Sequence, residues 1–149
     1  VGMSLALTGD IVMASDTAYF LQAFAKIGLV PDGGATWYLP RLIGWGRAME
    51  LSMLAERLPA SEALSWGLVN RVVPEAELAA ASMAMAQRLA SGPKSLGLIR
   101  KAYWASWEND FNKQMQLEAD LQTEAHASAD NREGVAAFLE KRPPVFTGK

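Results

Sequence analysis

Residues 28–34 read Gly-Leu-Val-Pro-Asp-Gly-Gly and form the most irregular segment of the chain. Three glycines and a proline in seven positions favour a tight turn, because glycine accepts backbone angles that other residues avoid and proline restricts its own. An apolar helical pattern resumes at residues 35–39, and Pro40 is expected to break or kink that helix. The stretch therefore predicts a turn that leads directly into a helix.

Short elements are predicted before this turn. Residues 2–7 are compatible with a helix. The apolar stretches at residues 11–14 and 18–21 are typical of short buried strands, which need partner strands elsewhere in the chain.

After the turn the pattern becomes mainly helical. A helix is expected from Trp45 onward and a short one over residues 61–66, ending at Gly67, and residues 68–73 form one more strand. Longer helices are then expected at residues 75–90, 93–106, 110–127 and from 130 to just before Pro143. The chain is therefore of the α/β class with more helix than strand, and it shows no internal repeat or linker.

The composition excludes several classes of function. The 149 residues carry 14 Lys and Arg against 16 Asp and Glu, a net charge of −2, without a basic run that would attract nucleic acid or an anionic membrane. With no cysteine there is no disulfide, no thiolate nucleophile and no Cys-containing zinc site, which suits a reducing compartment such as the cytoplasm. No apolar stretch is long enough to span a bilayer. We expect a soluble cytoplasmic protein that binds neither nucleic acid nor membrane.

Few residues offer catalytic chemistry by type alone. His126 is the only histidine, and it lies on a predicted amphipathic helix, where a surface position is the ordinary interpretation. Neither a Ser-His-Asp triad nor a metal site is therefore expected. Asp32 stands out because it lies between a proline and two glycines just ahead of a helix. Its carboxylate can cap that helix, or it can act as an acid and base.

Several blocks of sequence together resemble the crotonase superfamily, which contains the enoyl-CoA hydratases and isomerases. They are GMSLALTGD at residues 2–10, GLVPDGGAT at 28–36, LPRLIG at 39–44, GLVN at 67–70 and DNREG at 130–134. Their order and spacing agree with the family over the whole chain. By this resemblance the chain is expected to be only the C-terminal portion of such an enzyme.

The resemblance implies a fold, a substrate and an assembly. The expected fold is α/β, the C-terminal portion of the crotonase-like spiral, with no independent domain boundary. Residues 1–74 would belong to its core, and residues 75–149 would form a helical part that covers CoA and makes oligomer contacts. The implied substrate is an acyl-CoA thioester, handled without a metal or redox cofactor. The implied assembly is a homo-oligomer, either a trimer or a dimer of trimers.

In such enzymes two backbone N–H groups hold the thioester carbonyl oxygen. Removing a proton beside a thioester places negative charge on that oxygen, and donors already aimed at it stabilise the charge. By the resemblance, one donor lies in an N-terminal segment that this chain does not contain. The other falls on Val1, with Gly2 beside it at the start of a helix.

The carboxylates distinguish members of the family. Hydratases carry two glutamates that position and deprotonate a water molecule, and the matching positions here are Ser4 and Phe24. The acid present is Asp32, where double-bond isomerases and 1,2-epoxyphenylacetyl-CoA isomerases carry a single Asp or Glu. One carboxylate suffices for isomerisation, because it can remove a proton from one carbon and return it to another. Asp32 is therefore the expected acid and base, and Ser4 and Phe24 should make a poor hydratase.

The resemblance also implies binding residues. The acyl side of the pocket is expected to be lined by Ser4, Phe20, Leu21, Phe24 and Trp37. Phe138 and Lys141 match the residues that the family brings to the CoA of a neighbouring subunit, although Lys141 is equally well explained as a solvated lysine at a helix end. Two other functions stay open: hydration of a 2-enoyl-CoA, and an inactive module that only oligomerises or binds CoA.

Overall fold

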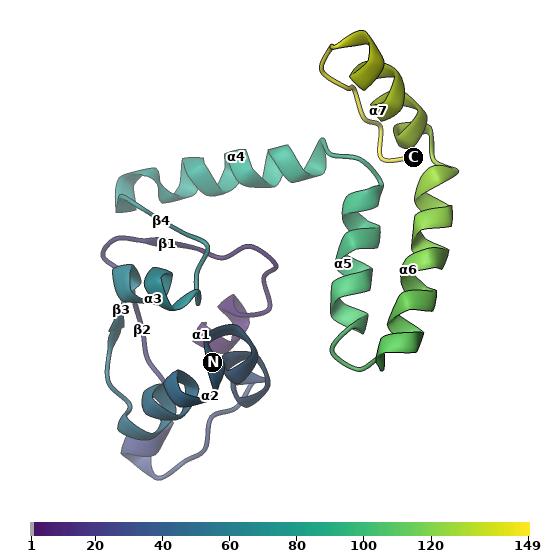
Figure 1. Ribbon diagram of the computed structural model, residues 1–149. Helices are drawn as coiled ribbons and strands as arrows, with labels where there is room; N and C mark the ends of the chain where they lie inside the picture. Colours follow the sequence, from purple (N-terminus) through teal and green to yellow (C-terminus); the bar gives the residue numbers. More distant parts are fainter. Residues whose placement is uncertain (1) are drawn as a thin grey trace. The chain divides into compact units, whose positions relative to one another are not determined.

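The computed structural model describes residues 2–149 (Figure 1). It consists of two compact units, of which the first extends to Met83 and the second runs from Ala84 to Lys149. The boundary lies within helix α4 (Leu78–Ala90), which leads from one unit into the other. Each unit is described by itself.

The first unit contains all of the described strands, and α2 is its longest helix. Its elements before α4 are α1 (Gly2–Ala6), β1 (Met13–Ser15), β2 (Tyr19–Phe20), η1 (Ala23–Ile27), α2 (Ala35–Leu54), β3 (Leu58–Pro59), α3 (Ala60–Trp66), β4 (Arg71–Val73) and η2 (Glu75–Glu77). This order confirms the α/β class with short strands.

The strands form two pairs, each joining segments far apart in the sequence. β1 runs parallel to β4, with Met13 opposite Arg71. β2 runs antiparallel to β3, with Phe20 opposite Leu58. The three predicted strands are present, each shorter than its apolar stretch, whereas the sequence pattern does not predict β3.

Helix α2 is interrupted at Gly44 rather than at Pro40. Gly44 has φ 79° and ψ 162°, so two helical segments meet there. Pro40 lies inside the first segment, so the expectation that the helix breaks or kinks at Pro40 is wrong, while the helix expected from Trp45 onward is confirmed. A positive φ costs little at glycine because it has no Cβ, so the change of direction falls on that residue.

The core of the first unit lies around α2 and α3. Ala35 and Leu39 of α2 and Ala60 and Ala63 of α3 have no exposed surface. Gly67 ends α3 in the left-handed conformation, and its N–H donates to carbonyls of the last turn, which confirms the predicted end of this helix.

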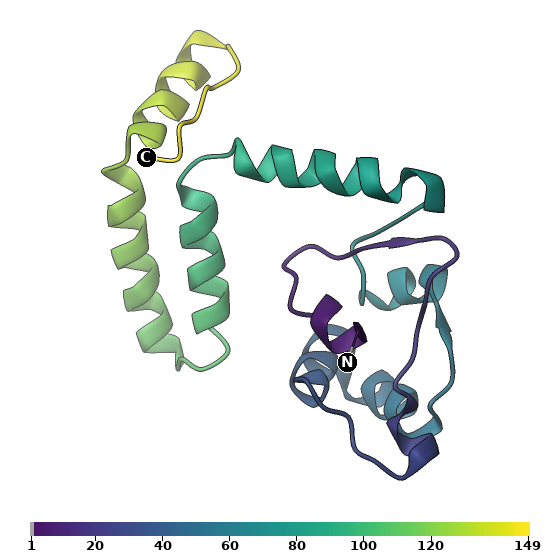
Figure 2. The same ribbon diagram turned by 180° about the vertical axis from the view of Figure 1, so that it is seen from behind.

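The second unit is helical beyond α4. Its helices are α5 (Ser95–Ala105), α6 (Phe111–His126) and α7 (Ala129–Glu140). Helices α5 and α6 lie side by side in opposite directions, as both Figure 1 and Figure 2 show. The Asp110 carboxylate caps α6 by accepting from the N–H of Lys113, and the Ser128 hydroxyl caps α7 by accepting from the N–H of Asn131.

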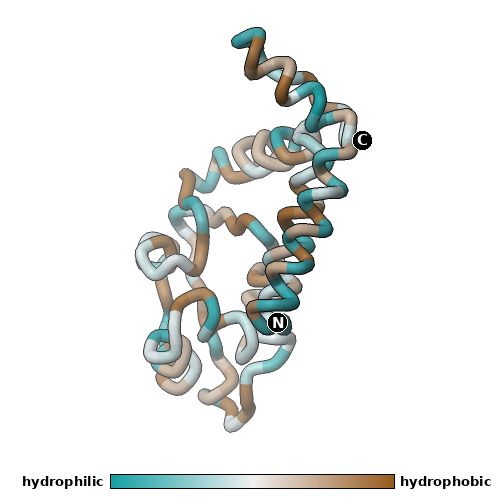
Figure 3. The backbone as a smooth tube through the Cα atoms, turned by 45° about the vertical axis from the view of Figure 1, so that its right-hand side comes forward, coloured by the Kyte–Doolittle hydropathy of each residue, from teal (hydrophilic) through white to brown (hydrophobic). Residues whose placement is uncertain are grey.

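Hydrophobic and hydrophilic residues alternate along these helices (Figure 3). Within residues 2–149, no helix is both long enough and apolar enough to cross a membrane.

Candidate functional site

The turn that carries Asp32 is fixed against helix α1. The Ser4 hydroxyl donates to the Asp32 carbonyl at 2.9 Å, and the Ala35 N–H donates to the same oxygen at 3.1 Å. Ser4 is 1% exposed, so its hydroxyl is held inside the unit. These two bonds fix the backbone of Asp32 and do not involve its side chain.

Gly33 permits this close approach. A Cβ at Gly33 would lie 2.9 Å from the Cβ of Ser4, closer than two carbon atoms can pack, and the residue has a φ of +61°. The turn can therefore rest on α1 only because residue 33 has no side chain.

The Asp32 carboxylate does not cap helix α2. The N-cap is Gly34, whose φ is 85°, and within the described part of the chain no side-chain hydrogen bond caps the first turn. The capping interpretation of Asp32 is therefore wrong. Asp32 is exposed, and among the described residues its carboxylate forms no hydrogen bond or ion pair. This arrangement leaves the carboxylate available to a bound molecule.

The proposed backbone donors belong to the segment that Ser4 anchors. Gly2 is the first residue of α1 and is exposed. The N–H groups at the start of a helix have no partner within the helix, so they can donate to another group. Val1 lies outside the described residues. The structure thus holds the Gly2 end of α1 and the Asp32 turn together through one buried hydroxyl.

The four apolar residues predicted for the acyl pocket have different environments. Phe20 is buried in the core, while Leu21 and Phe24 are half-buried. Trp37 is 41% exposed, and the guanidinium of Arg41 lies 3.5 Å from the centre of its ring. None of these residues lines the apolar cavity of this unit. Their role in binding stays a prediction.

That cavity has a volume of about 390 Å³ and begins at the residues just before Asp32. Its lining includes Leu29, Val30 and Pro31 of the turn and Trp45 and Met49 of α2. Leu29 and Val30 are also largely exposed. The turn therefore carries an apolar surface directly before its carboxylate.

We expect Gly33→Ala to impair the site strongly. The left-handed backbone alone costs about 1–2 kcal/mol for a residue with a Cβ, and the new methyl group would push the turn away from Ser4. In the complete protein, the variant should turn over its substrate more slowly and unfold at a lower temperature than the wild type. Gly28→Ala is the matched control, because Gly28 has a similar φ of +72° but open space around it. Equal loss of activity in both variants would contradict a special role for the contact with Ser4.

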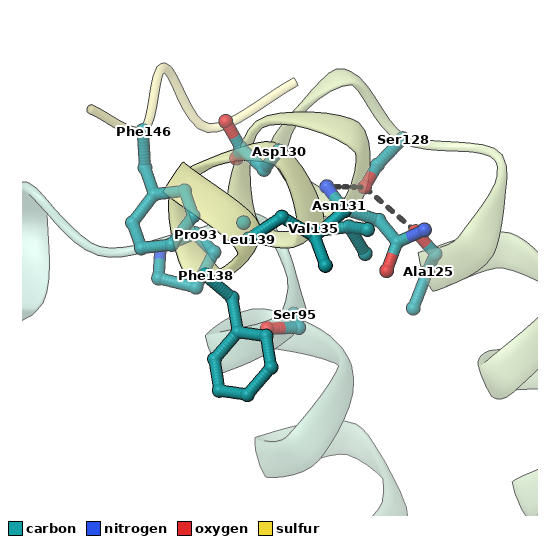
Figure 4. Close-up of a pocket in the computed structure, with 11 residues that line it drawn as sticks. Pro93, Ser95, Ala125, Ser128, Asp130, Asn131, Val135, Phe138, Leu139 and Phe146 are labelled. Carbon is teal, nitrogen blue, oxygen red and sulfur yellow. Dashed lines mark hydrogen bonds between the residues drawn. The ribbon is translucent and has the colours of Figure 1, made fainter. Parts of the chain in front are cut away.

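The second unit contains the two residues predicted to bind CoA. Phe138 is 82% exposed and lines a pocket of about 360 Å³, together with Pro93, Val135 and Phe146 (Figure 4). Lys141 is exposed, follows the last turn of α7 with a φ of 54°, and does not line this pocket. Of these two residues, only Phe138 lines this pocket.

A buried carboxylate fixes the C-terminal tail beside this pocket. Asp130 is 3% exposed, and its oxygens accept from the N–H groups of Thr147 at 2.7 Å, Lys94 at 2.8 Å and Gly148 at 2.9 Å. The hydrogen bond from Thr147 is the main reason that the pKa of Asp130 lies below its ordinary value, and those from Lys94 and Gly148 act in the same direction. One side chain thus joins α7, the loop before α5 and the tail.

An ion pair fixes the same tail one turn further along α7. Arg142 donates to both carboxylate oxygens of Glu133, at 2.6 and 3.0 Å, and its Nε donates to Glu140 at 2.6 Å. Hydrogen bonds from Arg142 and from the N–H of Val145 lower the pKa of Glu133 to about 2. Asp130 and Glu133 are therefore ionised when they bind residues of the C-terminal tail.

We expect the Glu133–Arg142 pair to stabilise the fold at neutral pH but not in strong acid. The pKa of Glu133 falls from 4.5 to about 2 on folding, so the stabilisation is complete above pH 4.5 and is lost as the pH falls toward 2. Thermal midpoints of wild-type and Glu133→Gln proteins should differ at pH 7 and converge near pH 2. Glu140→Gln, which removes a single contact with Arg142, should have a smaller effect. A difference that does not depend on pH would refute this account.

Sequence reasoning missed the tail-binding role of Asp130 and Glu133. Asp130 can be seen in the sequence at the start of α7, but its partners are residues 94 and 147–148, which no local pattern connects to it.

Within residues 2–149, no three His, Asp or Glu side chains gather as metal ligands would. His126 is exposed, and its ring nitrogen contacts the carbonyl of Gln122.

Comparison with known proteins gives consistent matches over the whole chain. Residues 1–149 match the family model described as enoyl-CoA hydratase/isomerase. The chain is 48% identical to a Rhodobacter capsulatus protein named "Probable enoyl-CoA hydratase", with 99% of the chain and 58% of the relative covered. It is also 48% identical to the 1,2-epoxyphenylacetyl-CoA isomerase of Escherichia coli, with 99% and 57% covered. The chain thus spans less than two thirds of these relatives.

Solved structures agree with these sequence matches. Subunit I of an enoyl-CoA hydratase from Geobacillus kaustophilus superposes with a TM-score of 0.94 at 40% identity, covering 99% of this chain and 58% of that one. The enoyl-CoA hydratase of Bacillus anthracis superposes with a TM-score of 0.93 at 33% identity and the same coverage. Each unit therefore has the fold of the corresponding part of these enzymes.

Proposed function

Because the chain belongs to the enoyl-CoA hydratase/isomerase family, we propose that the protein carrying it isomerises an unsaturated or epoxidised acyl-CoA. In this proposal Asp32 moves the proton, and the backbone N–H groups at the start of α1 stabilise the enolate oxygen. No metal or redox cofactor takes part.

One observation carries the proposal. Asp32 is held against α1 by the Ser4 hydroxyl, while the carboxylate itself has no partner among the described residues. A base must be fixed in place yet free to take up a proton, and this arrangement meets both needs. Ser4 and Phe24 supply no second carboxylate that could activate water.

The proposed reaction needs only one carboxylate, because the same group removes and returns the proton. Asp32 removes a proton from the carbon between the thioester and the double bond of a 3-enoyl-CoA, and the electron pair moves onto the thioester oxygen. The dipole at the start of α1 favours that negative charge. Asp32 then returns the proton to the far carbon of the former double bond. The product is the 2-enoyl-CoA, and no water is consumed.

Hydration of a 2-enoyl-CoA is the other candidate, since a relative at 48% identity bears a hydratase name. Against it stand the hydroxyl at residue 4 and the apolar ring at residue 24. The relative at the same identity whose name gives 1,2-epoxyphenylacetyl-CoA as substrate favours the isomerase.

The deciding experiment is a spectrophotometric assay of the complete protein with a 3-enoyl-CoA and a 2-enoyl-CoA. Isomerisation of the first without hydration of the second would support the proposal. Rapid hydration would replace it with a hydratase. If neither occurs but 1,2-epoxyphenylacetyl-CoA is converted, the substrate is the epoxide. Binding of CoA thioesters without any turnover would identify an inactive module.

We also propose that the protein is a homo-oligomer, a trimer or a dimer of trimers. Large apolar side chains of the second unit are exposed in the single chain, including Ile99, Tyr103, Phe111 and Leu139. Exposed apolar surface of this kind is typical of subunit interfaces. Light scattering of the complete protein would give the mass, and a monomer would overturn this part of the proposal.

A further inference from the structure

Gln22 is the one residue of the described core whose buried polar group lacks a partner. It lies between β2 and η1 and is 1% exposed. Its Nε2 donates to the sulfur of Met3 at 3.4 Å, and its Oε1 accepts no hydrogen bond from any of residues 2–149. Turning the amide by 180° would place its oxygen against the Met3 sulfur, which has no hydrogen to donate, so the oxygen would still lack a partner. Gln22 therefore makes a single weak polar contact at the cost of an unsatisfied group.

Packing does not explain this residue. A leucine or methionine would fill a similar volume without burying an amide, and a buried polar group without a partner is unfavourable. Buried groups that are left unsatisfied in native proteins call for a reason outside the packing. Among the described residues, the only polar contact of the Gln22 side chain is with Met3, so the role of the buried amide must involve Met3.

Met3 lies between the two functional parts of α1. It follows Gly2, whose backbone is part of the proposed oxyanion hole, and precedes Ser4, whose hydroxyl holds Asp32. Gln22 contacts α1 from the segment after β2, whereas Ser4 ties it to the turn before α2. The start of this short helix is thus held from two sides.

We propose that Gln22 is a positioning residue, which holds the start of α1 through Met3 so that the Gly2 backbone is aimed at the thioester oxygen. This inference rests on the proposed function and adds a residue to it. Gln22 touches no reacting atom. Its amide acts only by fixing Met3, and the misplacement of an aimed donor by a fraction of an ångström weakens charge stabilisation more than substrate binding.

The test uses Gln22→Met and Met3→Leu in the complete protein. Each substitution removes one half of the contact and keeps the volume. We expect kcat to fall on the order of tenfold in each variant, KM for the acyl-CoA to change little, and the thermal midpoint of Gln22→Met to stay the same or rise. The double variant should be no slower than either single variant, because both remove the same contact.

A second readout separates this inference from the proposed reaction. A 3-oxoacyl-CoA is an enolisable probe, and stabilisation of its enolate in the site produces near-ultraviolet absorption. If the wild type produces this absorption without isomerising any substrate, the proposed function fails, and its loss in Gln22→Met still supports positioning. If Gln22→Met keeps both kcat and the absorption, or loses stability while keeping kcat, Gln22 has only a structural role and the inference is overturned.

Discussion

Asp32→Asn should lower the rate of isomerisation by on the order of 10³-fold while leaving the binding of CoA thioesters unchanged. The carboxamide has nearly the same shape as the carboxylate but cannot accept a proton at neutral pH. The backbone of residue 32 should stay in place, because Ser4 and Ala35 bind its carbonyl rather than its side chain. The measurements are kcat with a 3-enoyl-CoA and the dissociation constant of a non-reacting CoA thioester.

A matched substitution makes this result specific. Glu56→Gln removes another exposed carboxylate of the first unit, which follows α2 in the chain, and should leave kcat unchanged. Unchanged turnover in Asp32→Asn would refute the assignment of Asp32 as acid and base. Equal losses in both variants would indicate a general effect of charge instead.

Asp130→Ala should be the most destabilising single change in the second unit. It leaves the N–H groups of Lys94, Thr147 and Gly148 without their acceptor, in a place where the carboxylate is almost fully buried. We expect a thermal midpoint lower by several degrees and much faster hydrogen exchange at the amides of Thr147 and Gly148 than in the wild type. Calorimetry and native-state hydrogen exchange measure the two effects.

Asp120→Asn is the control for this change. Asp120 lies on α6 and is exposed, and among the residues that the structure describes its side chain accepts only from Gln116, so its replacement should have little effect on stability. The thermal midpoint of Asp130→Asn should lie between those of the wild type and Asp130→Ala, since the amide keeps one acceptor oxygen. If Asp130→Ala unfolds at the wild-type temperature, the tail is not fixed by this carboxylate.

Much of the local structure could be predicted from residue type alone. The end of α3 at Gly67 and the helices of the second unit follow from glycine chemistry and apolar periodicity. The break in α2 was misplaced, because Pro40 keeps helical backbone angles, whereas Gly44 adopts the positive φ that the change of direction requires.

The candidate site was predicted in part. The resemblance pointed to Asp32, Gly2 and Ser4, but only the structure shows that the Ser4 hydroxyl holds the Asp32 carbonyl and that Gly34, not Asp32, caps α2. The acyl pocket was predicted from aromatic residues. The cavity before Asp32 is a different one, whose lining includes residues of the turn and of α2, and the binding role of those aromatic residues stays a prediction.

The amino-acid sequence by itself determined the class of fold, the family and the supply of chemical groups: one carboxylate in a glycine-rich turn, no cysteine and a single histidine. Only the tertiary structure decided which groups meet. Ser4 binds a carbonyl 28 residues away, and Asp130 binds N–H groups 17, 18 and 36 residues away. Helix and turn preferences act over about four residues along the chain, whereas these hydrogen bonds depend on how the helices pack.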